Sequence, residues 1–268
     1  MYMGLDIILL FKYVPNTTTV NVDPNTGTLI REGVPSVVNP HDLVAAEFAL
    51  KLREKYGGKI RAMIMAPPSA TKGIEYLVGM GIDEGILLTD RAYGGADTLA
   101  TSYVISQAIK KVVDRYDLII TGQETLDSST AHIGAQVASW LGIPYVYYVT
   151  DAVLEDGSLV VTRQLESYVE KYRIKLPGLI SVLMHSQQPR DVTLSNKLRF
   201  IKEKPIKVYT NNELKLNTLC TGLKGSPTIV AKTEFIGKIP RKQQIIQGKS
   251  PEEMVSWLLS KLKEEKVI

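Results

Sequence analysis

The stretch that decides the fold is Asp117-Leu118-Ile119-Ile120-Thr121-Gly122-Gln123-Glu124-Thr125-Leu126-Asp127-Ser128-Ser129-Thr130-Ala131-His132-Ile133-Gly134. Residues 118–121 form the short apolar run that is typical of a buried parallel strand. After a glycine and a polar loop comes a helical pattern, in which Ile133, Val137 and Leu141 share one face and Gly142 marks the end. The stretch therefore predicts a strand, a polar loop and a helix in direct succession.

This succession of elements is suited to binding an anion. The first N–H groups of a helix have no intrahelical partners, and the helix dipole favours negative charge beside them. The hydroxyls of Ser128, Ser129 and Thr130 add further donors at the same place. Two interpretations are open on local sequence alone: a phosphate or pyrophosphate cradle, or an ordinary helix whose N-cap is Asp127 or Ser128.

The composition is that of an ordinary globular protein. Of 268 residues, 44% are hydrophobic and 22% charged, and the net charge of +4 is too mild to indicate a nucleic-acid partner. The single cysteine, Cys220, excludes an intrachain disulfide and fits a reducing compartment, so we expect a cytoplasmic protein. The apolar run from Ile7 to Phe11 is too short for a membrane span and predicts a buried strand instead, so no direct membrane insertion is expected.

The first half of the chain alternates strands and helices at the spacing of βαβ units. Strands are predicted at 7–11, 59–66, 84–89, 118–121 and 144–149, and the intervening patterns are helical. Asn39 is a good N-cap for the first helix, with Pro40 at its first position and Asp42 favourable to its dipole. This alternation predicts an α/β fold with a doubly wound parallel sheet, and Lys12 follows the first strand at the edge where such sheets bind ligands.

The second half of the chain departs from this alternation. An antiparallel hairpin at 152–161, turning at Asp156-Gly157, is followed by strands at 168–175 and 179–184 and a helix at 192–200. Residues 211–227 are loop-like, 229–236 are a possible strand, and 251–263 form an amphipathic helix capped by Ser250. We therefore divide the chain into an α/β nucleotide-binding domain, 1–206, and a C-terminal arm, 207–268. A shorter hairpin is predicted at 21–30, with turn residues from Asp23 to Gly27.

Several separate blocks, in colinear order over roughly residues 5–210, resemble one known family. Lys12-Tyr13-Val14-Pro15, Gly27 to Pro35 and Asn39-Pro40-His41-Asp42 resemble the beginning of an electron transfer flavoprotein β subunit. Asp90 to Ser102 resembles a second block of that family, and Gly122 to Gly134 its nucleotide loop, usually G-x-x-x-x-D-G-D-T-A-Q-V-G. Leu176-Pro177 and Pro189-Arg190 with Leu194 resemble later blocks. The departures are Ser128-Ser129 in place of Gly-Asp and His132 in place of Gln.

The resemblance implies a fold, a partner and a cofactor. The fold would be Rossmann-like, of the adenine-nucleotide-hydrolase-like kind, and the C-terminal arm would pack on an α subunit that carries one FAD. The β site would hold AMP in the housekeeping branch, or a second FAD that takes hydride from NADH in the electron-bifurcating, Fix-like branch. The glycine-bearing loop from Asp90 to Thr98 and the run Thr130-Ala131-His132-Ile133 favour the second branch.

The resemblance also nominates residues for these roles. Cofactor-binding candidates are Lys12, Asn39, Asp42, Ala66, Asp90, Arg91, Gly95, Thr98, Gly122, Gln123, Thr125, Asp127, Ser128, Ser129, Thr130, Ala131, His132 and Ile133. Arg91 could offset the negative charge that develops on a reduced flavin, or could form an ordinary surface salt bridge. His132 could contact phosphate, cap its helix or face solvent. No side chain is expected to be catalytic and no metal is expected, because the three histidines lack metal-ligand spacing.

The partners follow from the same resemblance. Leu194 matches the family's docking leucine, although a buried helix residue is as good an interpretation of the residue itself. The expected redox partners are NADH, a quinone reductase or acyl-CoA dehydrogenase, and ferredoxin or flavodoxin. Two alternatives remain open: a housekeeping subunit with structural AMP, and a stand-alone nucleotide-binding or ATP-hydrolysing domain, which would be a stable monomer.

Overall fold

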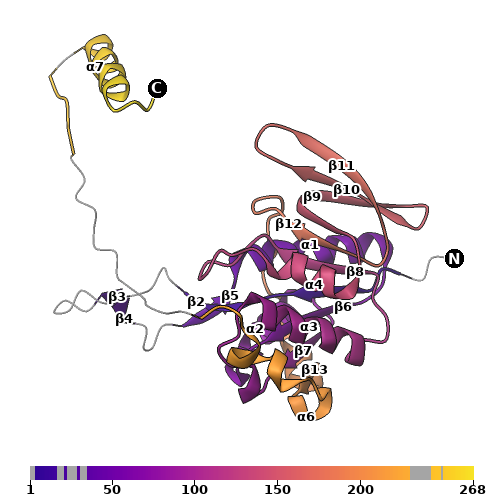
Figure 1. Ribbon diagram of the computed structural model, residues 1–268. Coiled ribbons are helices and arrows are strands. Elements are labelled where there is room, and N and C mark those ends of the chain that lie inside the picture. Colours follow the sequence, from indigo (N-terminus) through magenta and orange to yellow (C-terminus); the bar gives the residue numbers. More distant parts are fainter. Residues whose placement is uncertain (1–3, 17–20, 23–28, 31–34, 230–242, 249) are drawn as a thin grey trace. The chain divides into compact units, whose positions relative to one another are not determined.

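The computed structural model describes residues 4–16, 21–22, 29–30, 35–229, 243–248 and 250–268. The chain divides into two compact units, 1–230 and 231–268 (Figure 1). Residues 207–230, which the sequence assigned to the C-terminal arm, therefore belong with the α/β unit. None of the described helices is long and apolar enough to cross a bilayer.

A nine-stranded sheet forms the centre of the first unit, in the order β11-β10-β9-β12-β8-β1-β6-β7-β13. Its strands are β1 Ile7–Leu10, β6 Ile60–Met65, β7 Glu84–Leu88, β8 Leu118–Gly122, β9 Tyr145–Glu155, β10 Ser158–Gln164, β11 Val169–Lys175, β12 Gly178–Val182 and β13 Ile206–Tyr209. The seven strands β9, β12, β8, β1, β6, β7 and β13 are parallel to one another. β10 and β11 are antiparallel additions at one edge. The predicted doubly wound parallel sheet with an added hairpin is confirmed.

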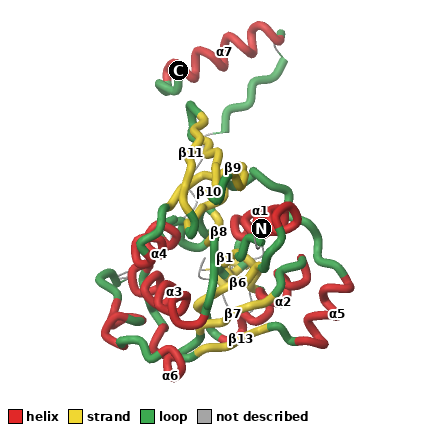
Figure 2. The backbone as a smooth tube through the Cα atoms, turned by 90° about the vertical axis from the view of Figure 1, so that its right-hand side faces the viewer, coloured by secondary structure: helices red, strands yellow, loops and turns green. Residues whose placement is uncertain are grey.

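Helices cover both faces of this sheet, as Figure 2 shows. On one face lie α1 Pro40–Tyr56, α2 Thr71–Met80 and α5 Leu194–Glu203; on the other lie α3 Thr98–Val112, α4 Ile133–Leu141 and the short α6 Asn211–Leu214. Strand residues alternate between the two apolar layers. Ile7 and Leu9 pack with α1 and α2, whereas Ile8 and Leu10 pack with α3 and α4. Burial on both faces explains why these strands are continuous apolar runs.

Smaller elements complete the first unit. β2 Tyr13–Pro15 pairs with β5 Ser36–Val38, and β3 Asn21–Val22 pairs with β4 Leu29–Ile30 as the predicted hairpin requires, although its turn lies outside the described residues. The 3₁₀ turns are η2 Pro68–Ala70, η3 Arg91–Tyr93, η4 Thr218–Cys220 and η5 Gly222–Gly225.

Two strands differ from the sequence expectation. β9 does not end at Val149 but continues into the hairpin that turns at Asp156-Gly157; its pairing with β12 is irregular beside Tyr148, whose φ is +60°. β13 was not predicted, because it has only four residues and follows Pro205. It pairs with β7 and extends the sheet by one parallel strand.

The second unit contains α7 Pro251–Glu264. Ser250 accepts a hydrogen bond from the Glu253 amide, and the Glu253 side chain accepts one from the Ser250 amide, so the predicted cap is confirmed as a capping box. The possible strand at 229–236 lies outside the described residues from Val230 onward.

Candidate functional site

The predicted site residues lie along one edge of the sheet, where neighbouring parallel strands end. Lys12 follows β1, Gly122 ends β8, Ala66 follows β6, and Asp90 lies two residues beyond β7. Since β8, β1, β6 and β7 are consecutive neighbours, these four positions share the carboxyl edge at which open α/β sheets bind ligands.

A buried carboxylate joins three elements at this edge. Asp42, in the first turn of α1, accepts hydrogen bonds from the amides of Lys12 at 2.8 Å and Gly122 at 3.1 Å. A Cβ on Gly122 would lie 2.4 Å from Asp42 Oδ1, so only glycine fits there. Burial raises the pKa of Asp42 to about 7, against the lowering effect of the two amides and of Lys12. Asp42 thus fixes the ends of β1 and β8 against α1.

Asn39 has a different role from the one predicted. It stands at the N-cap position of α1, but its side chain makes no capping hydrogen bond. Instead Nδ2 donates to the Glu124 carbonyl at 2.8 Å, and Oδ1 accepts from the Leu126 amide at 3.3 Å. The prediction of a side-chain cap was wrong, because the loop after β8 offers this fully buried amide better-placed partners.

The loop after β8 carries an ion pair and a cluster of hydroxyls. Lys12 Nζ lies 2.5 Å and 2.7 Å from the two carboxylate oxygens of Asp127, and 3.4 Å from Ser128 Oγ. The Thr125 and Ser128 hydroxyls are 2.9 Å apart, and Ser129 donates to the Thr125 carbonyl through both its amide and its hydroxyl. Because α4 begins only at Ile133, the interpretation of Asp127 or Ser128 as its N-cap is wrong.

Donors remain available between this loop and α4. The amides of Thr130, Ala131 and His132 have no hydrogen-bond partner among the described residues. Ser129 and Ala131 have positive φ, +49° and +56°, which is uncommon for residues other than glycine. His132 is exposed at the N-cap position and its side chain does not cap, while Ile133 begins the helix. Free amides, loop hydroxyls and the Lys12 ammonium form a donor set that fits phosphate oxygens.

A second group of predicted residues lies beyond β7. Asp90 uses one carboxylate oxygen for the Ala92 amide at 2.8 Å and the other for the Asn211 amide at 2.9 Å, so its side chain holds the loop in place. Arg91 is exposed. Thr98 begins α3, and its hydroxyl accepts a hydrogen bond from Gln136 of α4 at 3.3 Å. The N-terminal turns of α3 and α4 therefore meet at the same edge.

Two side chains, from β12 and β9, hold the backbone after β8. Ser181 donates to the Gly122 carbonyl at 2.8 Å, and the Tyr147 hydroxyl donates to the Gln123 carbonyl. The Gln123 side chain, predicted to bind cofactor, accepts from the Met184 amide at 3.2 Å. Ser181 and Tyr147 were not predicted. For Ser181 the available signal was a lone hydroxyl inside the apolar strand 178–182, since a buried polar group requires a partner.

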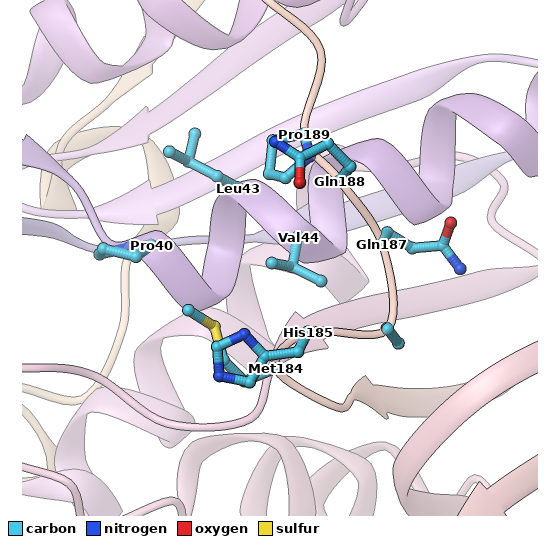
Figure 3. Close-up of a pocket in the computed structure, with 9 residues that line it drawn as sticks. Pro40, Leu43, Val44, Met184, His185, Gln187, Gln188 and Pro189 are labelled. Atoms are coloured by element: carbon cyan, nitrogen blue, oxygen red, sulfur yellow. The ribbon is translucent and has the colours of Figure 1, made fainter.

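A cavity of about 410 Å³ lies beside this edge, as Figure 3 shows. Pro40, Leu43 and Val44 line it from α1, and residues 184–189 line it from the segment after β12. His41 is 7% exposed, and its Nδ1 has no partner among the described residues. Burial lowers the pKa of His41, while the charge of Glu124 opposes this. None of the predicted cofactor residues is among those that line the cavity.

Leu194 is placed on the surface. It is 73% exposed at the first position of α5, which contradicts the interpretation as a buried helix residue. Arg190 fixes the preceding segment on α1 through two bonds to the buried Glu47 carboxylate, at 2.8 Å and 2.9 Å, and one to Glu54 at 2.5 Å. The exposed Leu194 therefore follows a segment that ion pairs hold on α1.

Comparisons with known proteins identify the family of this chain. Residues 26–209 match the model of the electron transfer flavoprotein domain. An electron transfer flavoprotein subunit beta from Clostridium acetobutylicum is 39% identical, over 98% of this chain and all of that protein.

The chain belongs to the electron transfer flavoprotein β-subunit family.

Other relatives come from distinct assemblies. Subunit CarD of the caffeyl-CoA reductase-Etf complex of Acetobacterium woodii is 38% identical, over 98% of this chain and 99% of that protein. Protein FixA of Bradyrhizobium diazoefficiens is 37% identical, over 84% of this chain and 80% of that protein. The family match covers the predicted site residues from Asn39 to Leu194, whereas Lys12 lies before the matched range.

Proposed function

We propose that this chain binds FAD along the carboxyl edge of its sheet, as the β subunit of a heterodimeric, cytoplasmic electron transfer flavoprotein of the bifurcating or Fix-like branch. The observation that carries the proposal is that candidate binding groups follow both β8 and β7 along one edge of the sheet. β8 and β7 are three strand spacings apart, about 14 Å. A dinucleotide such as FAD would engage the hydroxyl loop after β8 and the Asp90–Thr98 loop after β7 together.

The residues nearest β8 would hold the phosphates. Lys12, the hydroxyl of Ser128 and the free amides of residues 130–132 would supply positive charge and donors there, and Ser129 would hold the loop through its bonds to the Thr125 carbonyl. The adjoining N-termini of α3 and α4, linked through Thr98 and Gln136, add favourable dipoles. Asn39 and Asp42 would act on the cofactor mainly by fixing this loop and its strand.

The residues beyond β7 would act on the flavin end. Arg91 is an exposed cation on a loop whose backbone Asp90 holds in place. Its charge would favour the reduced cofactor by offsetting negative charge. FAD would supply the redox chemistry, taking hydride from NADH and releasing the two electrons to different acceptors. The proposed acceptors are the α-subunit FAD, leading to a quinone reductase or acyl-CoA dehydrogenase, and ferredoxin or flavodoxin.

Leu194 would dock the redox partner. An exposed leucine on a helix held by the Arg190–Glu47 pair presents an apolar contact with little ordering cost on binding.

Counting the cofactors tests the proposal. The chain is co-expressed with its α subunit, and the purified heterodimer is extracted and assayed for FAD and AMP. Two FAD per heterodimer, with bleaching of the flavin absorbance on addition of NADH, are expected. One FAD and one AMP would identify a housekeeping subunit instead, and a monomer that turns over ATP would identify a stand-alone nucleotide hydrolase.

A further inference from the structure

A segment that was expected only to be loop-like packs over the Asp90–Thr98 loop. Residues Gly222–Thr228, here called the strap, follow β13 and α6 in the chain and lie beside α3 and η3 (Figure 1, orange). None of the predicted cofactor residues belongs to the strap, yet it makes several direct contacts with the loop that carries Asp90, Arg91, Gly95 and Thr98.

Asp97 is the main point of attachment. One of its carboxylate oxygens accepts from the Ala100 amide at 3.0 Å and so caps α3. The other accepts from the Thr228 hydroxyl at 2.8 Å and the Thr228 amide at 3.2 Å. The Asp97 amide in turn donates to Ser226 Oγ at 2.8 Å, and Ser226 Oγ donates to the Gly222 carbonyl at 2.7 Å. Asp97 thus joins the beginning of α3 to the end of the strap.

Two glycines allow the strap and the loop to approach closely. Gly95 has φ +71°, and a Cβ there would lie 2.6 Å from Leu223 Cγ. A Cβ on Gly222 would lie 2.3 Å from the Ala92 carbonyl oxygen. The Leu223 amide donates to the Gly94 carbonyl at 3.2 Å. The space that a side chain at position 95 would need is therefore occupied by Leu223.

The other end of the loop is held by residues that also follow β13. The Asn211 amide donates to Asp90 at 2.9 Å, and the Tyr93 hydroxyl donates to the Asn211 side-chain oxygen at 3.1 Å. The loop is therefore fixed at its start by Asn211 and at its end by Ser226 and Thr228, leaving the exposed Arg91 between them.

We propose that Ser226 and Thr228 are positioning residues for the β-site cofactor, because they hold the loop that presents Arg91 and Thr98. This inference rests on the proposed binding of FAD at that loop. The strap does not contact the hydroxyl loop after β8 in any described interaction, so its effect on affinity would act through the Asp90–Thr98 loop alone.

The test uses the full heterodimer and three variants of this chain. The double variant Ser226→Ala/Thr228→Val removes both hydroxyls. Thr228→Ser keeps the hydroxyl and is the conservative variant. Thr218→Val makes the same chemical change at an exposed threonine of the neighbouring turn and is the matched control. FAD is titrated into heterodimer whose β site has been emptied, and amide deuterium exchange is measured without cofactor.

In the double variant the Asp97 amide is expected to exchange faster, and β-site FAD to bind about tenfold more weakly, which corresponds to about 1.4 kcal/mol. Thr228→Ser and Thr218→Val should bind as wild type, and the flavin content of the α subunit should stay constant in all of them. If the double variant does not assemble, Ser226→Ala and Thr228→Val are titrated singly.

Unchanged exchange and unchanged FAD affinity in the variants would overturn the inference while leaving the proposed function intact. A wild-type heterodimer that takes up no second FAD would overturn the proposed function itself, and the positioning role with it.

Discussion

The carboxylate of Asp42 accepts a hydrogen bond from the Gly122 amide at 3.1 Å, across 80 residues of chain. This bond joins the first turn of α1 to the end of β8, and the bond from the Lys12 amide to the same carboxylate adds the end of β1. One buried acid, Asp42, therefore organises the carboxyl edge of the sheet. Ionisation of Asp42 should change the free energy of unfolding.

The first prediction concerns pH. Burial raises the pKa of Asp42 from 3.8 to about 7, so between these values the folded chain keeps a proton that the unfolded chain releases. The contribution of Asp42 to stability should fall as pH rises through this window and level off above about pH 7. Asp42→Asn cannot ionise. Relative to wild type, its free energy of unfolding should therefore rise between pH 4 and pH 8, by on the order of 4 kcal/mol for about 3 pKa units.

Urea unfolding of both proteins at several pH values measures this difference. Any loss of stability from Asp42→Asn that is the same at every pH cancels, because only the change of the difference with pH is compared. A difference that does not vary with pH would show that Asp42 titrates in its ordinary range.

The second prediction separates two roles of Asn39. Serine caps helices as well as asparagine does, but it cannot reach both the Glu124 carbonyl and the Leu126 amide. Asn39→Ser should therefore be as harmful as Asn39→Ala, accelerating deuterium exchange of the Leu126 amide and lowering thermal stability. Recovery of wild-type stability in Asn39→Ser would identify Asn39 as an N-cap after all.

The third prediction concerns the charge of Lys12. Its ammonium is the cation beside Asp127 and Ser128, and a hydrogen bond between charged groups contributes roughly 1.5–3 kcal/mol. Lys12→Gln should weaken binding of FAD or AMP to the β site by about tenfold or more, measured by fluorescence or calorimetric titration. Lys72→Gln, at an exposed lysine of α2, is the control. Equal affinities of the two variants would remove Lys12 from the phosphate site.

The fourth prediction concerns docking. Leu194 and Leu219 are exposed to similar extents, 73% and 69%, but lie on α5 and η4 respectively. Leu194→Ala should raise the KM for the redox partner several-fold and leave kcat nearly unchanged, because a central apolar contact is lost without effect on the flavin chemistry. Leu219→Ala should change neither constant. Both should shift stability by less than about 0.5 kcal/mol, as surface substitutions do.

Local patterns were sufficient where burial repeats along the chain. The apolar runs at β1, β6, β7 and β8 predicted a parallel sheet because strands buried on both faces contain few polar residues. Ser250 was recognised as a cap, since it binds an amide only three residues ahead. The hairpin turn at Asp156-Gly157 was likewise a local signal.

Contacts between distant segments could not be predicted in the same way. Asn39 matches the pattern of an N-cap, yet its partners lie 85 and 87 residues away. β13 and the strap carry too few apolar residues in sequence to show a period, and their positions depend on pairing with β7 and on contact with Asp97.

The sequence by itself determined the parallel α/β architecture, the family and the edge of the sheet where the candidate site lies. Strand burial and the motif blocks are patterns among residues that are close together in the chain. Only the tertiary structure decided which side chains hold that edge together. Asp42 is hydrogen-bonded to Gly122, Asn39 to Leu126 and Thr228 to Asp97. Buried or confined polar groups need hydrogen-bond partners, and packing of the chain supplies them at any separation in sequence.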